Sequence, residues 1–188
     1  MSSSADSRSA PVADDFVAQL AGLAPDGATA ALRAFRGDAT RYTQGSHDAL
    51  FSTDVADLTL RERLFAAWYA ALLSNAEQTA LAYRERLLAL ASAADAQTET
   101  TRSLLEAIAA QRAVPVASTA TTDQRLAAIL RHTQALTLRP AATGKPALGT
   151  LQAAGLTTRA IVALSQLVAF VTYQVRVVAA LRALEARA

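Results

Sequence analysis

The sequence contains no cysteine. This absence excludes disulfide bonds, thiolate metal sites, iron–sulfur clusters and any thiol redox cycle carried by this chain alone. Histidine is almost absent too: His47 and His132 are the only two, and neither has a ligand-type side chain one helical turn away. We therefore expect no metal and no cofactor, and structural roles for both histidines. A cysteine-free chain is compatible with the cytoplasm, which is where we expect the protein.

Clustered charge and long apolar runs are also scarce. The 18 basic and 16 acidic residues give a formal charge of +2, and the arginines are scattered singly, without a basic stripe or interleaved aromatics. Nucleic acid is therefore not expected as a partner. The most apolar run, residues 160–175, contains Ser, Gln, Thr and Tyr and is flanked by Arg159 and Arg176. It is shorter than the roughly 20 residues of a membrane span, so we expect a buried central helix and no membrane association.

Ala, Leu and Arg dominate what is present, and no segment alternates apolar and polar residues for long. This pattern predicts an all-α fold. The polar start of the chain predicts a disordered tail over residues 1–12, followed by a single domain over residues 13–188 with a linker at 113–123. The predicted helices are 14–23, 28–36, 41–51, 59–73, 75–92, 99–112, 123–138, 147–154 and 157–185.

Two helix starts carry the capping-box pattern, in which a Ser or Thr and a Glu three residues later each bond the other's backbone N–H. They are Thr59 with Glu62, and Ser74 with Glu77. Helix N-termini are places where proteins hold anions or reactive thiolates. The second start, however, offers only small or amide side chains, among them Ala76 and Thr79. It has the geometry of a reactive site and none of its chemistry.

One weak internal repeat joins the two most apolar regions. "LTLRERLFAAWYAALL" begins at Leu58 and "LTTRAIVALSQLVAFV" begins at Leu156; both open with Leu-Thr-x-Arg and continue with an alanine-rich apolar helix. The repeat predicts two related helical halves.

Aromatic residues mark the candidate ligand site. Trp68 lies on the predicted helix 59–73 and Tyr83 on the next one, while Phe170, Tyr173 and Arg176 share one face of the last helix. An Arg on an apolar face needs an anionic or carbonyl partner. One interpretation pairs Arg176 with a helix C-terminus or with a carboxylate such as Glu62, and we favour it. The other is a pocket for a small anionic or polar ligand, lined by Arg176, Tyr173 and Trp68.

The segments "HTQALTLRP" and "LQAAGLTTRAIVALSQLVAFVTYQVR", with "LTLRERLFAAWYAALLSNAEQTALAYRERL", resemble the carboxymuconolactone decarboxylase (CMD) and alkylhydroperoxidase D-like (AhpD-like) superfamily. The resemblance is closest to the peroxidase-related and CMD-domain branches and extends over residues 13–185. It implies an AhpD-like helical fold and a homo-oligomer, either a trimer or a hexamer. The high apolar content, 52% of the residues, favours an oligomer as well.

Thiol peroxidases of that superfamily carry a C-x-x-C pair at a helix start, a preceding Glu and a following His. The resemblance places the two cysteines at Ala76 and Thr79, the Glu near Leu64 and the His at Tyr83. This sequence departs from the pattern at all four positions. The resemblance therefore implies vestigial redox positions and excludes thiol peroxidase activity.

Two functional hypotheses remain. The first is a non-redox structural or small-ligand-binding member that acts beside a related CMD-domain or AhpD-like oxidoreductase. The second is a cysteine-independent enzyme of the carboxymuconolactone decarboxylase type, acting on a small carboxylate or lactone. Its candidate catalytic residues are Tyr83 and His132, with Arg176 binding the anion. The second hypothesis requires these three side chains to converge on one hydrogen-bonded site.

Overall fold

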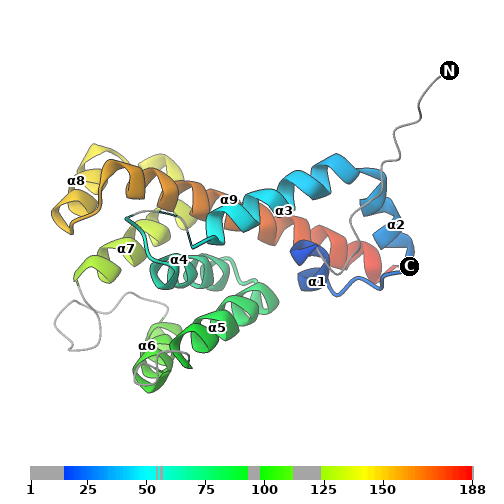
Figure 1. Ribbon diagram of the computed structural model, residues 1–188, viewed down its shortest axis with the longest axis horizontal. Helices are drawn as coiled ribbons and strands as arrows, with labels where there is room; N and C mark the ends of the chain where they lie inside the picture. Colours follow the sequence, from blue (N-terminus) through cyan, green and yellow to red (C-terminus); the bar gives the residue numbers. More distant parts are fainter. Residues whose placement is uncertain (1–14, 54, 56, 93–97, 112–123, 188) are drawn as a thin grey trace. The chain divides into compact units, whose positions relative to one another are not determined.

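The structure is a computed structural model that describes residues 15–53, 55, 57–92, 98–111 and 124–187. All regular structure in these residues is helical, which confirms the all-α fold (Figure 1). The helices are α1 (Phe16–Ala21), α2 (Ala28–Phe35), α3 (Gly37–Phe51), α4 (Leu60–Leu73), α5 (Glu77–Ser92), α6 (Thr98–Gln111), α7 (Gln124–Leu138), the short 3-10 helix η2 (Pro140–Ala142), α8 (Lys145–Ala153) and α9 (Thr158–Glu185).

Each of the nine predicted α-helices has a counterpart. The largest difference is α3, which begins at Gly37 instead of residue 41. The predicted tail over residues 1–12 and the linker at 113–123 lie outside the described residues. The chain divides into two compact units: residues 1–49 with 176–188, and residues 50–175. α3 and α9 each contribute to both units.

An ion pair joins the first two helices of the first unit. The Asp15 carboxylate caps α1 by accepting hydrogen bonds from the backbone N–H groups of Val17 (3.1 Å) and Ala18 (3.2 Å). The same carboxylate is bound by two nitrogens of the Arg33 guanidinium from α2, one of them at 2.9 Å. Asp15 is 3% exposed, so this pair ties α2 to the start of α1 in a place screened from water.

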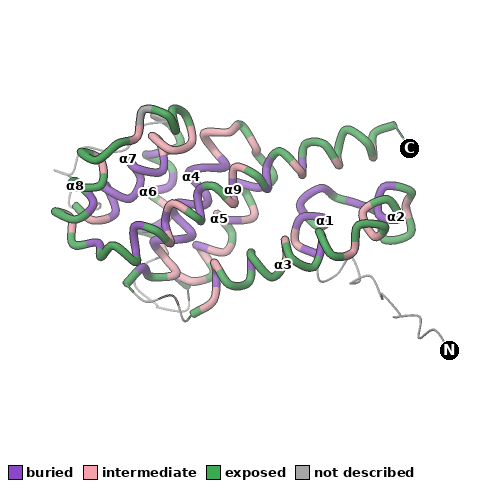
Figure 2. Tube along the Cα trace, turned by 90° about the horizontal axis from the view of Figure 1, so that it is seen from above, coloured by how far each residue is buried: buried purple, intermediate pink, exposed green. Residues whose placement is uncertain are grey.

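The second unit is built around α4. Ten consecutive residues, from Glu62 to Ala71, are buried, and the helix packs against both α5 and α7. α5 packs in turn against α6, and α7 against α8. Alanines at four of the buried α4 positions let neighbouring helices approach closely on several sides. Figure 2 shows α4 as a buried element surrounded by partly exposed ones.

The prediction that residues 160–175 form the buried central helix is wrong, because α4 takes that place. α9 buries one face, which includes Leu164, Leu167 and Val171, while only 39% of its most apolar 18-residue window is buried. By length and composition alone α9 could cross a membrane, but core helices of soluble proteins meet the same criterion. A membrane position does not follow from it.

The second predicted capping box is also wrong. Ser74 is not an N-cap: it is the C-cap of α4, and its hydroxyl donates to the carbonyl of Ala70 (2.8 Å). Asn75 takes the left-handed conformation (φ 54°), its N–H bonds Leu72 O, and the N–H of Ala76 bonds Ala71 O. These bonds form a Schellman motif, which ends α4 and delays the start of α5 to Glu77.

The two repeated segments begin alike and then diverge. Thr59 caps α4 in a complete capping box with Glu62, and the Thr157 hydroxyl accepts from the N–H of Ala160 at the start of α9 (3.1 Å). The first segment then breaks at Asn75 into two helices, whereas the second continues as one helix to Glu185. The shared pattern therefore specifies a helix start and not two equivalent halves.

Candidate functional site

The most distinctive polar contact in the second unit joins α5 to α9. The hydroxyl of Tyr83 donates to Oε1 of Gln174 at 2.8 Å, and both residues are 0% exposed. Burial raises the pKa of Tyr83 above its ordinary value, because the phenolate would lose its hydration. At neutral pH the Tyr83 hydroxyl is therefore a fixed hydrogen-bond donor and not a base.

Stacked groups hold Tyr83 from another side. Its ring stacks with that of Phe51, the last residue of α3, at a centroid distance of 5.3 Å. The Arg86 guanidinium lies over both rings, 4.7 Å from the Phe51 centroid and 5.9 Å from the Tyr83 centroid. Tyr83 thus joins α5 to the end of α3 and to α9, which is the behaviour of a core residue.

The other positions that the resemblance assigns lie in two places: Leu64 is the fifth residue of α4, whereas Ala76 and Thr79 are at the start of α5. Leu64 and Thr79 are each 1% exposed, whereas Ala76 is half-buried. Ala76 precedes the first residue of α5, and Thr79 is its third residue. The Thr79 hydroxyl and the Gln174 Nε2 atom are buried without a hydrogen-bond partner.

His132 lies on α7 and is 5% exposed. Its Nε2 atom is 3.3 Å from the Ser165 hydroxyl on α9, and Nδ1 has no partner. Burial lowers the pKa of His132, since the imidazolium is poorly solvated there. The other histidine, His47, is 8% exposed, and its ring lies 4.4 Å from that of Phe16. Both environments suit structural histidines.

The buried neutral His132 predicts a loss of stability in acid. The folded state has the lower His132 pKa, so the unfolded chain takes up this proton first as the pH falls below about 6.5. We expect the melting temperature to fall between about pH 8 and about pH 5, and His132→Gln to reduce that fall. Ser165→Ala leaves the imidazole in place, so this variant should show the same fall in melting temperature as the wild type. Equal slopes in the wild type and His132→Gln would contradict the prediction.

The hydrogen bonds do not bring Tyr83 and His132 into one site. Their partners on α9, Gln174 and Ser165, are nine residues apart, which corresponds to a rise of about 13.5 Å and roughly two and a half turns. The two partners therefore lie at opposite edges of the buried face of α9. A proton relay through both side chains is not formed by these contacts.

The three proposed ligand-binding residues differ in their surroundings. Trp68 is 3% exposed and meets the Phe65 ring edge-on at 6.4 Å. Tyr173 is 46% exposed and Arg176 is exposed. Glu62, the carboxylate suggested for Arg176, is instead paired with Arg125 (2.5 Å). A shared pocket for Trp68, Tyr173 and Arg176 stays a prediction.

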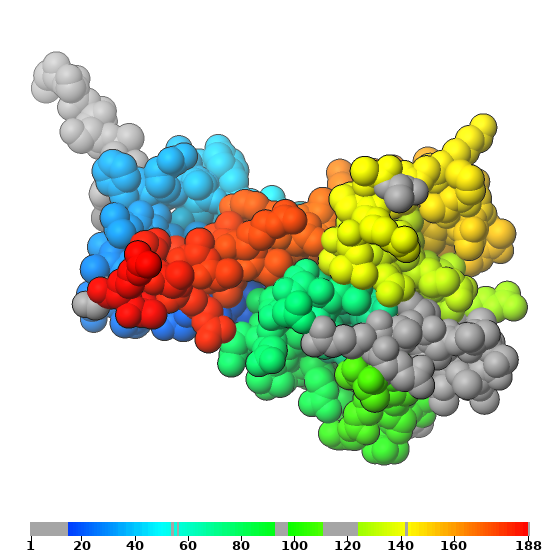
Figure 3. All heavy atoms as spheres, turned by 180° about the vertical axis from the view of Figure 1, so that it is seen from behind, coloured from blue at the N-terminus to red at the C-terminus, as the bar shows by residue number. Residues whose placement is uncertain are grey.

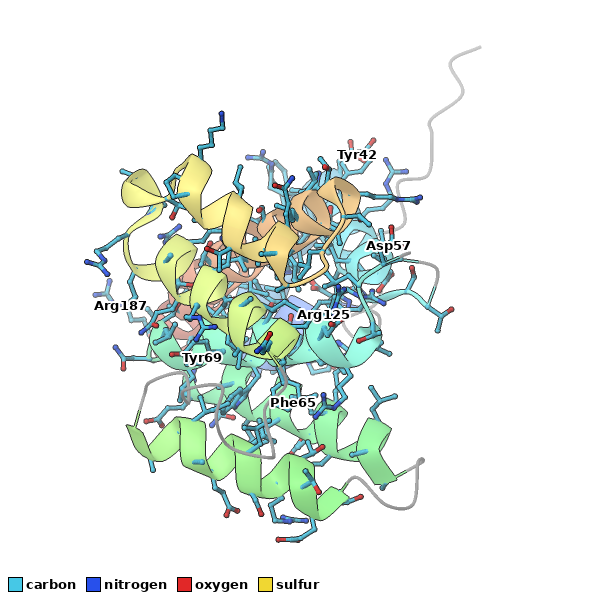
Figure 4. All side chains as sticks on the ribbon, turned by 90° about the vertical axis from the view of Figure 1, so that its left-hand side faces the viewer. Tyr42, Asp57, Phe65, Tyr69, Arg125 and Arg187 are labelled. Carbon is cyan, nitrogen blue, oxygen red and sulfur yellow. The ribbon has the colours of Figure 1, made fainter. Side chains whose placement is uncertain are left out.

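Sequence reasoning missed the Arg125 cluster. From the second residue of α7, the Arg125 guanidinium reaches the Glu62 carboxylate, the carbonyl of Asp57 (2.5 Å) and that of Gly155 (2.7 Å). Arg125 and Asp57 are labelled in Figure 4. The Asp57 carboxylate also accepts a hydrogen bond from the Thr157 hydroxyl (3.0 Å). The cluster joins the starts of α4, α7 and α9. No spacing in the sequence signals it, because its members come from three distant segments.

Among the residues that the structure describes, no three His, Asp or Glu side chains gather where they could hold a metal ion. Comparison of the sequence with family models and with curated proteins finds no match.

Proposed function

We propose that this protein is a non-redox member of the CMD and AhpD-like superfamily, a cytoplasmic structural or small-ligand-binding oligomer that acts beside a related oxidoreductase. The observation that supports it most is the buried bond from Tyr83 to Gln174 (2.8 Å). At the position where the resemblance expects a histidine base, the chain has a phenol that cannot accept a proton at neutral pH. The reactive position has become part of the core.

The helix start supports the same proposal. Ala76 and Thr79 keep the one-turn spacing of a C-x-x-C pair at the N-terminus of α5, where a thiol would have a lowered pKa. Neither supplies a nucleophile. The Thr79 hydroxyl on α5 and the Gln174 Nε2 atom on α9 are buried without a hydrogen-bond partner. Burying a polar atom in this way costs about 1–3 kcal/mol, and a bound small polar molecule would supply the missing hydrogen bonds.

Exposed apolar side chains support the oligomer, either the trimer or the hexamer. Phe35 and Leu32 on α2 are 88% and 64% exposed, and Val162 on α9 is 51% exposed. The decarboxylase alternative has less support, because Tyr83 and His132 bond to opposite edges of α9 and Arg176 is at the surface.

Restoring the cysteines tests the redox resemblance. The wild type should reduce no hydroperoxide with dithiol donors, because it has no thiolate. Ala76→Cys with Thr79→Cys should fold, since the Thr79 hydroxyl makes no hydrogen bond that the change would remove. The pair should form an intramolecular disulfide on mild oxidation, and the thiol at position 76 should titrate below about 8.5. Thiol content by mass spectrometry and a pH titration of thiol reactivity provide the measurements.

The control is Ala76→Cys with Gln78→Cys, because side chains two residues apart on a helix do not face each other. This variant should keep both thiols free. If the 76/79 pair also stays reduced while the fold is intact, the turn does not have the redox geometry and the proposal loses its basis. Peroxide turnover by the wild type would overturn it directly.

A further inference from the structure

The outward face of α9 carries a regular row of uncharged residues. Residues 160–175 contain no charged side chain. Val162 is 51% and Tyr173 46% exposed, and Gln166 and Ala169 between them are exposed too. We call these four residues the α9 stripe. Part of α9, orange in Figure 3, is open at the surface, and Figure 2 shows exposed and buried positions alternating along it.

The spacing of the stripe is that of a helix-pairing seam. Its members follow one another at intervals of four, three and four residues, which is the alternation of a and d positions in a coiled coil. Long helix surfaces that carry no charge are normally covered by another element. The stripe therefore has the period of a surface that pairs with another helix, and none of its residues is charged.

The order of residues along the stripe favours a second copy of α9 as the partner. Gln166 and Tyr173, its only polar members, lie on either side of Ala169. If two copies of α9 cross in opposite directions near Ala169, each Gln166 carboxamide comes beside the partner's Tyr173 hydroxyl. The small Ala169 side chain at the crossing lets the helix axes approach to about 8–10 Å. The stripe is thus complementary to itself.

Charge and dipole favour the antiparallel direction as well. A parallel pair would place Arg159 against Arg159 and Arg176 against Arg176 at the two ends of the uncharged segment, and like charges facing each other are unfavourable. An antiparallel pair offsets them and also opposes the two helix macrodipoles. We propose that the α9 stripe is a twofold interface with a second copy of this chain, formed by antiparallel α9 helices that cross near Ala169.

This inference specifies the oligomer within the proposed function. A twofold contact is isologous, so it is compatible with a dimer or a hexamer and incompatible with a simple threefold ring. It does not depend on the vestigial redox turn, so its failure would leave the test at positions 76 and 79 unaffected.

Mass in solution is the first test. The full chain should behave as an even multiple of 19.7 kDa in light scattering at micromolar concentration. Ala169→Glu should raise the Kd of the pair at least tenfold, or about 1.4 kcal/mol, because it buries a charge at the crossing. Ala107→Glu makes the same change at an exposed alanine of α6 and should leave the mass unchanged.

Disulfide trapping tests the direction, since the chain has no other cysteine. After mixing and oxidation, Gln166→Cys and Tyr173→Cys should give mainly the 166–173 cross-linked heterodimer, identified by its mass, while Ala169→Cys gives a homodimer. Ala107→Cys should stay monomeric. A monomeric wild type, an assembly that Ala169→Glu leaves intact, or cross-linking without preference would each overturn the proposal. Flotation of a monomeric wild type with lipid vesicles would assign the stripe to a membrane surface instead.

Discussion

Arg63→Met is expected to lower the free energy of unfolding by about 2–5 kcal/mol, because each buried carbonyl left without its donor costs about 1–3 kcal/mol. Arg63 is 2% exposed. Its Nη1 donates to the carbonyl of Leu50 (2.6 Å) and its Nε to that of Leu58 (3.1 Å). These carbonyls belong to the last turn of α3 and to the segment before α4. Methionine fills a similar volume and donates no hydrogen bond, so both carbonyls would lose this donor.

Burial by itself is unfavourable for Arg63 and lowers its pKa, although the neighbouring Glu62 raises it. The side chain is retained in the core because three backbone carbonyls, including Thr59 O (3.4 Å), accept from it. Guanidinium groups remain charged at any ordinary pH. The stabilisation therefore comes from hydrogen bonding to the α3–α4 connection rather than from a titrating pair.

Arg61 provides the matched control for Arg63. It lies two residues earlier on the same helix and is half-exposed, and its guanidinium rests 4.8 Å from the Phe65 ring centroid. Arg61→Met should cost about 1 kcal/mol, the usual strength of a cation–π contact that is only partly exposed. Urea denaturation followed by circular dichroism measures both variants. If Arg61→Met and Arg63→Met lower the free energy of unfolding equally, the buried hydrogen bonds of Arg63 stabilise the protein no more than the cation–π contact of Arg61.

Local patterns predicted the helices well because their information is local. The Thr59–Glu62 capping box is present as expected, and the apolar periodicity located α4, α5 and α9. Ser74 shows the limit of that method. Its serine-x-x-glutamate pattern is genuine, but the left-handed Asn75 gives α4 a C-cap that uses the same residues. The same residues could serve as the N-cap of α5 or the C-cap of α4, and the left-handed conformation of Asn75 makes them the C-cap.

The site was harder to predict because its contacts are distant in the sequence. Gln174 is one of a few polar residues in the apolar α9 helix, and only the packing of α5 shows that it receives the Tyr83 hydroxyl. Hydrophobicity also predicted the wrong central helix. α9 is the more apolar helix by sequence, but α4 is the more buried one, because its small alanines let neighbouring helices approach closely. Burial depends on how closely neighbours can approach as well as on polarity.

The Arg125 cluster provides the last prediction, a strong energetic coupling between Arg125 and Glu62. The guanidinium donates to Glu62 (2.5 Å) and to two loop carbonyls, and the Glu62 side chain is only 10% exposed. Arg125→Met should lower the free energy of unfolding by about 2–4 kcal/mol, since it leaves a nearly buried carboxylate and two carbonyls without this donor.

A double-mutant cycle separates the pair from the rest of the cluster. Glu62→Gln alone weakens both the ion pair and the cap at Thr59, whose backbone N–H donates to Glu62 Oε2 (2.7 Å). The double variant should be less destabilised than the sum of the single changes by about 1–3 kcal/mol, as for other contacting residues.

Arg102 with Glu99, an exposed pair on α6 at 3.7 Å, serves as the control cycle and should show a coupling under about 0.5 kcal/mol. If the Arg125–Glu62 coupling is as small as that, the guanidinium acts mainly on the carbonyls of Asp57 and Gly155. The starts of α4 and α9 would then be joined through the backbone, and removing the carboxylate would not release them.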